Sequence, residues 1–142
     1  MSERFVDVGS VDNFIAEQEN KATLQKTQRD VKLLQTFLGT RNELRKVEEI
    51  PALEFNEYIS EFIISVTTID GKDYEPSSLR SLLASFERHL KKNSYSASVM
   101  NDLLFEKTRK VLLSKQKELK TKGKGNRPNA SIAVTVEDSD DQ

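Results

Sequence analysis

Basic side chains concentrate in one stretch of this chain and give it a chemistry that the overall composition hides. Residues 71–127 contain 14 Lys and Arg against 6 Asp and Glu, a net charge of +8, whereas the 142-residue chain has a formal net charge of −1. Lys and Arg neutralise phosphates, so cations gathered in this way favour a polyanion as ligand. The stretch therefore supplies the first candidates for a binding surface.

Residues 77–92 separate into two faces when they are wound at the helical period of 3.6 residues per turn. One face is apolar and carries Leu79, Leu82, Leu83, Phe86 and Leu90. The opposite face carries Ser77, Arg80, Ser81, Ala84, Arg88 and Lys91, and Lys92 ends the segment. Cations bind phosphates and small side chains let a helix approach a groove closely, so this face predicts contact with nucleic acid. A solvent face is the alternative, but such a face usually mixes in acids, and here only Glu87 lies at its edge.

Two other segments show the same separation less clearly. Opposite the apolar residues of 21–38 lie Lys21, Gln25, Lys26, Arg29, Lys32 and Thr36, with Asp30 on the flank. In the last basic segment Arg109, Lys110, Lys117 and Lys120 share a sector beside the apolar one. Each segment alone is weak evidence, but together they favour double-stranded DNA as a partner.

Catalytic and metal-binding chemistry finds little support. The chain has no Cys and a single histidine, His89, around which no Ser and Asp are arranged. The five glycines are scattered at turns and form no phosphate-binding loop. Glu48, Glu49, Glu54, Glu57 and Glu61 resemble paired carboxylates, but acids are common near a helix N-terminus, and we interpret them as a solvated face. We predict no catalytic residue, metal, cofactor or small-molecule substrate.

Apolar spacing predicts four main helices. The first buries Leu24, Thr27, Val31, Leu34 and Leu38 within 21–38 and stops at Gly39, after one or two separate turns over 11–16 capped by Ser10. The second begins at Pro51 and buries Phe55, Ile59, Phe62, Ile63 and Val66. An Asp70-Gly71 turn precedes the third helix, 77–92. The fourth, about 104–122, buries Phe105, Leu112 and Leu119.

These elements predict an all-α protein, a compact bundle of four to five helices over residues 11–122. Residues 1–10 are expected to form a flexible arm, and residues 123–142 a linker remnant with a disordered acidic tail. The sequence shows no signal peptide and no apolar run near the ~18 residues of a membrane span. We therefore expect an intracellular protein with no membrane partner.

Several short motifs resemble a known family. They are residues 13–23 (NFIAEQENKAT), 30–34 (DVKLL), 49–51 (EIP), 73–79 (DYEPSSL) and 122–129 (KGKGNRPN). In this order they resemble the N-terminal, core-binding-like domain of Crypton-type tyrosine recombinases and of the derived zinc-finger MYM-type proteins, over about residues 11–130. The resemblance implies a small SAM-like bundle that grips DNA with helices facing the major groove, and these map best onto residues 21–38 and 77–92. It also implies a linker to a catalytic domain at 123–129.

The family's activity does not carry over to these residues. The recombinase catalytic set belongs to a following domain, whereas this chain continues from 123 into an acidic end. Tyr58, Tyr74 and Tyr95 fall within the predicted bundle or its turns and are not expected to act as nucleophiles.

Three hypotheses remain. The leading one is a non-catalytic DNA-binding module that is nuclear. The alternative is a protein-interaction bundle whose acidic face at Glu54, Glu57 and Glu61 docks a basic partner. The third, an active recombinase, would need the catalytic domain from another chain or from a longer form of this one.

Overall fold

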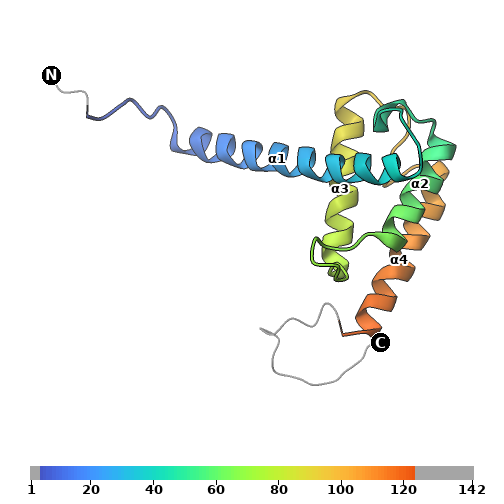
Figure 1. Ribbon diagram of the computed structural model, residues 1–142. Coiled ribbons are helices and arrows are strands. Elements are labelled where there is room, and N and C mark those ends of the chain that lie inside the picture. The colour runs from blue at the N-terminus through green and yellow to red at the C-terminus, as the bar shows by residue number, and fades with distance from the viewer. Residues whose placement is uncertain (1–3, 124–142) are drawn as a thin grey trace.

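The structure, a computed structural model, describes residues 4–123, and every regular element in that range is helical (Figure 1). The elements are α1 (Val11–Thr40), η1 (Val47–Glu49), α2 (Ala52–Ser65), α3 (Pro76–Lys92), η2 (Leu103–Phe105) and α4 (Glu106–Thr121), where η marks a 3₁₀ turn. This confirms the predicted all-α class with four main helices. The predicted tail beyond Gly123 and the first three residues lie outside the described range.

Helix α1 is longer than the sequence pattern predicted. It runs unbroken for 30 residues, beginning after Ser10, whose Oγ accepts a hydrogen bond from the Asn13 N–H at 3.2 Å. The predicted break between residues 16 and 21 is wrong, because residues 17–20 include no Gly, Pro or β-branched residue that would disfavour a helix. The apolar periodicity is missing there because no other helix covers these residues in the described range, and the helix itself continues.

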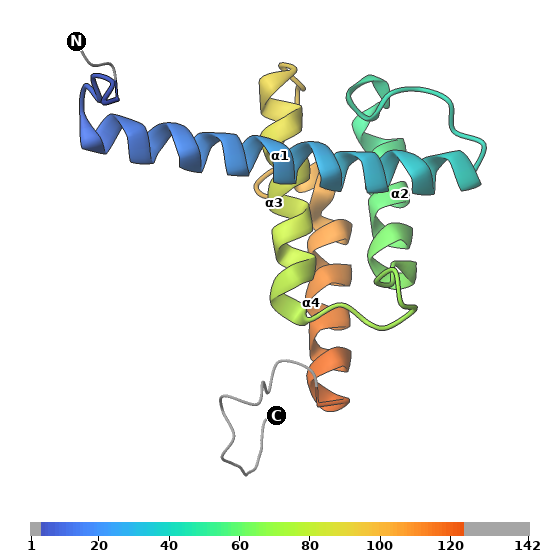
Figure 2. The same cartoon turned by 60° about the vertical axis from the view of Figure 1, so that its left-hand side comes forward.

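The N-terminal half of α1 extends past the rest of the molecule. Residues 11–25, called here the arm of α1, are all exposed, and shielding begins only at Lys26 and Thr27. Figures 1 and 2 show the arm passing beyond α3, on the side away from α2. At ~1.5 Å per residue the arm is about 22 Å long. Leu24, predicted to be core, lies on it and is 43% exposed.

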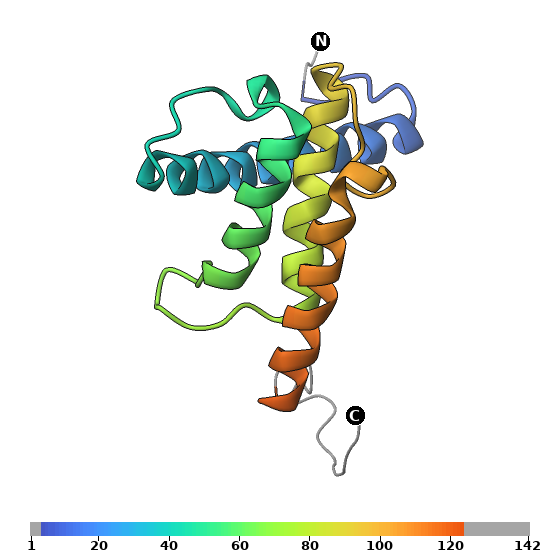
Figure 3. The ribbon, with the colours of Figure 1, turned by 90° about the vertical axis from the view of Figure 1, so that its right-hand side faces the viewer.

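Helices α2, α3 and α4 lie side by side, and α1 crosses them on one face (Figure 3). The whole apolar row predicted on α3 is buried, as are Phe55, Ile59, Phe62 and Ile63 of α2. Phe105, Leu112 and Leu119 are buried as predicted. The helical phases derived from the sequence are therefore confirmed for α2, α3 and α4.

Aromatic rings and one polar pair fix how the helices meet. The Phe62 ring packs edge-on against Phe37 of α1 and Phe86 of α3, with centroid distances of 5.5 Å in both cases. Between α2 and α4, the buried Asn56 accepts hydrogen bonds at Oδ1 from the Thr108 hydroxyl at 2.7 Å and the Thr108 N–H at 3.2 Å. A buried amide needs such partners, so this pair fixes the register of α2 against α4.

Replacing Phe86 with Ala tests this core. Its side chain is fully buried against Phe62, so Phe86→Ala should lower the free energy of unfolding by about 3–5 kcal/mol. The measurement is denaturant unfolding followed by circular dichroism. Leu113→Ala is the control, because Leu113 is 66% exposed and should change stability by less than about 0.5 kcal/mol. Equal destabilisation by both variants would contradict this description of the core.

Candidate nucleic-acid interface

One side of α3 remains uncovered after the helices pack, and it is basic. Ser77, Arg80, Arg88, Lys91 and Lys92 are all exposed there, and Ala84 is half-buried. Two contacts orient this side. Arg88 bonds to Thr27 near the arm of α1, whereas His89, on the other flank of α3, bonds to Glu48 in η1, which follows α1. The exposed side of α3 therefore faces the direction in which the arm projects (Figure 2).

Helix α4 extends this basic surface. Gln116 Nε2 donates to the Pro76 carbonyl at 2.9 Å and so sets the two helices side by side. Lys120 and Leu113, one turn on either side of Gln116, are exposed, and so are Lys110 and Lys117. Seven exposed cations of these two helices are called here the α3/α4 basic face: Arg80, Arg88, Lys91, Lys92, Lys110, Lys117 and Lys120. Lys107 of α4 is exposed too, but it pairs with Glu57 of α2 and is not included.

The predicted cations of α1 occupy a different face. Lys21, Gln25, Arg29 and Lys32 are exposed, and they lie opposite the buried Thr27, Leu34 and Leu38. The α1 row therefore points away from the bundle. On α3, Ser85 faces α1. Ala84, in the middle of the basic side of α3, is turned by about 100° from Ser85 around the helix axis. The basic side of α3 and the α1 row therefore face directions that differ by roughly a quarter turn. The structure does not join them into one flat surface.

Three predicted contact residues are half-buried, and two of them have partners within the protein. Lys26 is half-buried, with its Nζ 2.5 Å from Asp30 Oδ2. Arg109 is half-buried and donates from Nη1 to the carbonyls of Val99 and Asp102, both at 2.9 Å. Ser81 is half-buried on the side of α3 that α1 crosses. Lys26 and Arg109 therefore have partners within the protein, and all three side chains are less exposed than the other predicted contact residues, while their contact with DNA stays a prediction.

The loop between α3 and α4 explains the one acid seen near the basic row. Glu87 is 8% exposed and accepts hydrogen bonds from the Ser98 hydroxyl at 2.7 Å and the Val99 N–H at 2.9 Å. Lys91 lies 3.9 Å from its carboxylate, and Lys110 lies 3.8 Å from Glu106. Both lysine side chains are 74% exposed and lie near the outer limit of an ion pair, so both can exchange these partners for a phosphate, although the Glu87 carboxylate itself is nearly buried.

Sequence reasoning missed the polar cluster where α1 crosses α3. Asp30 is 6% exposed and accepts a hydrogen bond from the Ser85 hydroxyl at 2.6 Å, although its side chain was expected on a flank of α1. Arg88 joins the cluster through Thr27 and Ser85. The sequence did show that Ser85 is a polar residue between the apolar row and the basic row of α3. Only the packing of α1 against α3 shows that Asp30 is its partner.

The acidic residues proposed for a basic partner already have partners in the protein. Glu54 pairs with Arg45 at 2.5 Å, Glu57 with Lys107 at 2.7 Å and Glu61 with Arg41 at 2.8 Å. Glu48 lies 2.8 Å from His89. This arrangement weakens the hypothesis that Glu54, Glu57 and Glu61 form an open docking face.

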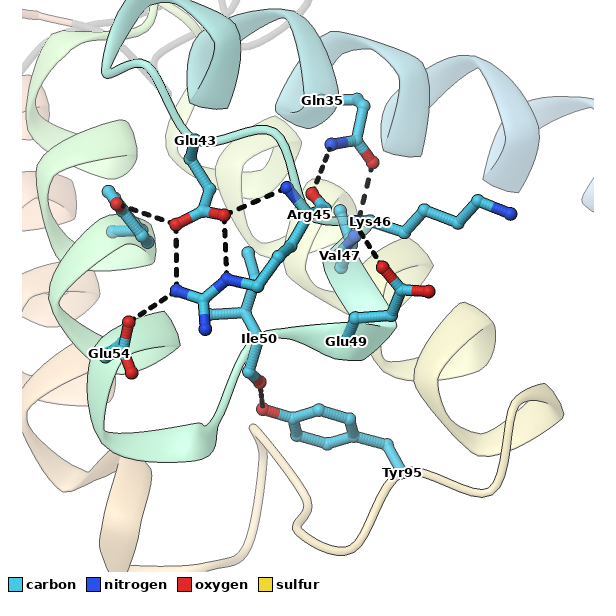
Figure 4. A network of polar contacts seen from close by, with 10 residues as sticks. Gln35, Glu43, Arg45, Lys46, Val47, Glu49, Ile50, Glu54 and Tyr95 are labelled. Carbon is cyan, nitrogen blue, oxygen red and sulfur yellow. Dashed lines mark hydrogen bonds and ion pairs between the residues drawn. The ribbon is translucent and has the colours of Figure 1, made fainter.

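Figure 4 shows the network that holds the connection between α1 and α2. Arg45 donates from Nε and Nη2 to the two oxygens of Glu43, at 2.8 and 2.9 Å, and its backbone N–H donates to Glu43 Oε2. Gln35 accepts from the Val47 N–H and donates to the Arg45 carbonyl, and the Tyr95 hydroxyl donates to the Ile50 carbonyl. The Arg45 guanidinium and then its N–H lower the pKa of Glu43 from 4.5 to about 2.

The described part of the chain offers no alternative site of clear chemistry. No three His, Cys, Asp or Glu side chains in residues 4–123 are grouped so as to hold a metal ion. No helix in the same range is long and apolar enough to cross a membrane. Comparison with protein-family models, curated proteins and solved structures finds no match to this chain.

The hydrogen bonds of Glu43 should make the stability of the fold depend on pH. Because the folded state holds the Glu43 pKa near 2, below the ordinary 4.5, the unfolded state binds more protons between these values. The stabilisation is complete above pH 4.5 and disappears as the pH falls towards 2. Glu43→Gln should therefore lower Tm at pH 6, and its deficit relative to wild type should shrink by pH 2.5. Thermal unfolding at a series of pH values measures this, and a deficit independent of pH would contradict it.

Proposed function

We propose that this chain is a non-catalytic module that binds double-stranded DNA through the α3/α4 basic face. The proposal shares DNA binding and the 77–92 helix with the resemblance to the core-binding-like domain of Crypton-type tyrosine recombinases. It differs in using α4 in place of the 21–38 helix. Its bound ligand would be chiefly the phosphate backbone, because Lys and Arg contacts to phosphate supply affinity without reading sequence.

The observation that carries the proposal is that three cations of this face are exposed and unpaired in the described range. The α1 row of Lys21, Arg29 and Lys32 shares this state, and only its direction distinguishes it. Arg80, Lys117 and Lys120 are exposed and form no ion pair with any residue in the described range. By contrast, Arg41, Arg45 and Lys107 elsewhere on the molecule are each paired with a carboxylate. Unpaired cations can neutralise phosphates without first breaking an internal salt bridge.

The direction of the face supports the same ligand. The exposed side of α3 looks towards the side on which the arm projects, so the arm and α3 border one open angle, and α4 lies on the other side of α3 (Figure 2). The arm is about 22 Å long. A partner lying in this angle meets the exposed side of α3, while the α1 row of Lys21, Arg29 and Lys32 looks away from it.

A matched pair of triple variants tests the proposal. Arg80→Gln, Lys117→Gln and Lys120→Gln together remove three unpaired cations from the α3/α4 basic face. Lys21→Gln, Arg29→Gln and Lys32→Gln remove three from the outer row of α1, with the same change in charge. All six side chains are exposed, so both triples should fold normally.

Affinity for a random-sequence duplex should be measured by fluorescence anisotropy at several salt concentrations. The α3/α4 triple should bind more weakly, and the slope of log K against log salt should shrink by about 0.9 for each phosphate that the variant no longer neutralises. The α1 triple should weaken binding much less. Equal weakening by both triples would indicate diffuse electrostatics without a defined face, and absence of DNA binding by the wild type would overturn the proposal.

The arm of α1 favours a protein contact as a second candidate function. Val11, Phe14 and Ile15 lie at helical spacing on one stripe and are 67%, 59% and 49% exposed. Exposed apolar groups gathered in this way are typical of an interaction surface. This candidate becomes the leading one if the wild-type protein fails to bind duplex DNA at low salt.

A further inference from the structure

Arg88 lies at the inner corner of the molecule, where α1 crosses α3 and the arm leaves the bundle. Its partners come from both helices, Thr27 on α1 and Ser85 one turn earlier on α3. From Arg88 towards the N-terminus of α3, the same side of the helix carries the half-buried Ala84 and the exposed Arg80. Arg88 thus lies at the vertex of the angle between the arm and the exposed side of α3.

The guanidinium of Arg88 is held in place although the residue is exposed. Its Nε donates to Thr27 Oγ1 at 2.9 Å, and its Nη2 donates to Ser85 Oγ at 3.0 Å. Ser85 in turn donates its hydroxyl proton to Asp30 at 2.6 Å. Both acceptors of Arg88 are uncharged hydroxyl oxygens.

The positive charge of Arg88 is not cancelled by a direct ion pair. Within residues 4–123 no carboxylate lies within 4.0 Å of its guanidinium, whereas Asp30, the acid of this cluster, pairs with Lys26. The Nη1 group also has no hydrogen-bond partner in that range, so its N–H groups remain available to a ligand. Arg88 therefore combines a fixed direction with an open charge and open donors.

We infer that Arg88 is a pre-ordered anchor for one backbone phosphate of the duplex, and that Thr27 is a positioning residue that acts through it. The inference rests on the proposed function and deepens it by naming the vertex of the angle as the anchoring point. Binding usually incurs the entropy cost of immobilising a long side chain, and here the fold has already incurred it. Arginine suits this role because its planar donors match the oxygens of a phosphate.

The hydroxyl of Thr27 can be removed almost without changing side-chain shape. Thr27→Val removes the oxygen that accepts from Arg88, and Thr27→Ser keeps it. DNA affinity of Thr27→Val should fall about two- to tenfold, the cost of ordering one long side chain on binding. Its salt slope should stay at the wild-type value because the charge remains. Thr27→Ser should restore wild-type affinity.

Variants of Arg88 distinguish the effect of its positive charge from the effect of its fixed side-chain orientation. Arg88→Gln should reduce the salt slope by about 0.9, the contribution of one phosphate. Arg88→Lys keeps the charge but cannot donate to both hydroxyls in the same geometry, so it should behave like Thr27→Val, with a normal slope and weaker binding. It also leaves Thr27 in place, which keeps the test valid if Thr27→Val lowers Tm.

Two outcomes would overturn the inference. One is wild-type affinity in both Thr27→Val and Arg88→Lys, and the other is an unchanged salt slope in Arg88→Gln. If the Arg80, Lys117 and Lys120 triple still binds DNA more weakly in that case, the DNA-binding function stands and only the anchor is wrong. If that triple also binds as the wild type does, the proposed function itself fails.

Discussion

The crossing of α1 over α3 is the constraint on which the other features of the molecule depend. Asp30 brings a carboxylate into a site that is only 6% exposed, and a buried charge is costly unless it is paired and hydrogen-bonded. Lys26 supplies the opposite charge and Ser85 the hydrogen bond. The same serine accepts from Arg88, so one small residue on α3 satisfies a buried acid and orients an exposed cation. The position of α1, the corner beneath its arm and the direction of Arg88 all follow from this contact.

The tertiary contacts also separate the basic residues of the chain into two groups with different roles. Some cations stabilise the protein from within: Lys26 pairs with Asp30, Arg109 holds the loop after α3, and Arg45 holds the connection after α1. Others, including Arg80, Lys117 and Lys120, have no such task in the described range and stay exposed. Net charge along the sequence could not separate these groups. It locates a basic region, and the internal partners show which of its members are available to a ligand.

Much of the fold could be predicted because burial on a helix leaves a periodic trace. The apolar rows of α2, α3 and α4 were placed correctly, and so were Ser10 as a cap and Asp70-Gly71 as a turn, where Gly71 has φ +79°. Apolar periodicity cannot predict a helix that packs against no other helix. The arm of α1 packs against nothing in residues 4–123, so its helix carries no buried row, and the sequence pattern broke it wrongly at residues 17–20.

The sequence by itself determined the helical class and the phase of the packed helical segments, because each of these depends on neighbours within one or two turns. Only the tertiary structure decided that α1 covers the serine side of α3, that Glu54, Glu57 and Glu61 are paired, and that the α1 row points away from the α3/α4 basic face. These features join residues up to 61 positions apart, as Thr27 and Arg88 are. The physical reason is that a side chain's partners depend on which helices meet and at what rotation, and helical periodicity in one segment carries no record of the other.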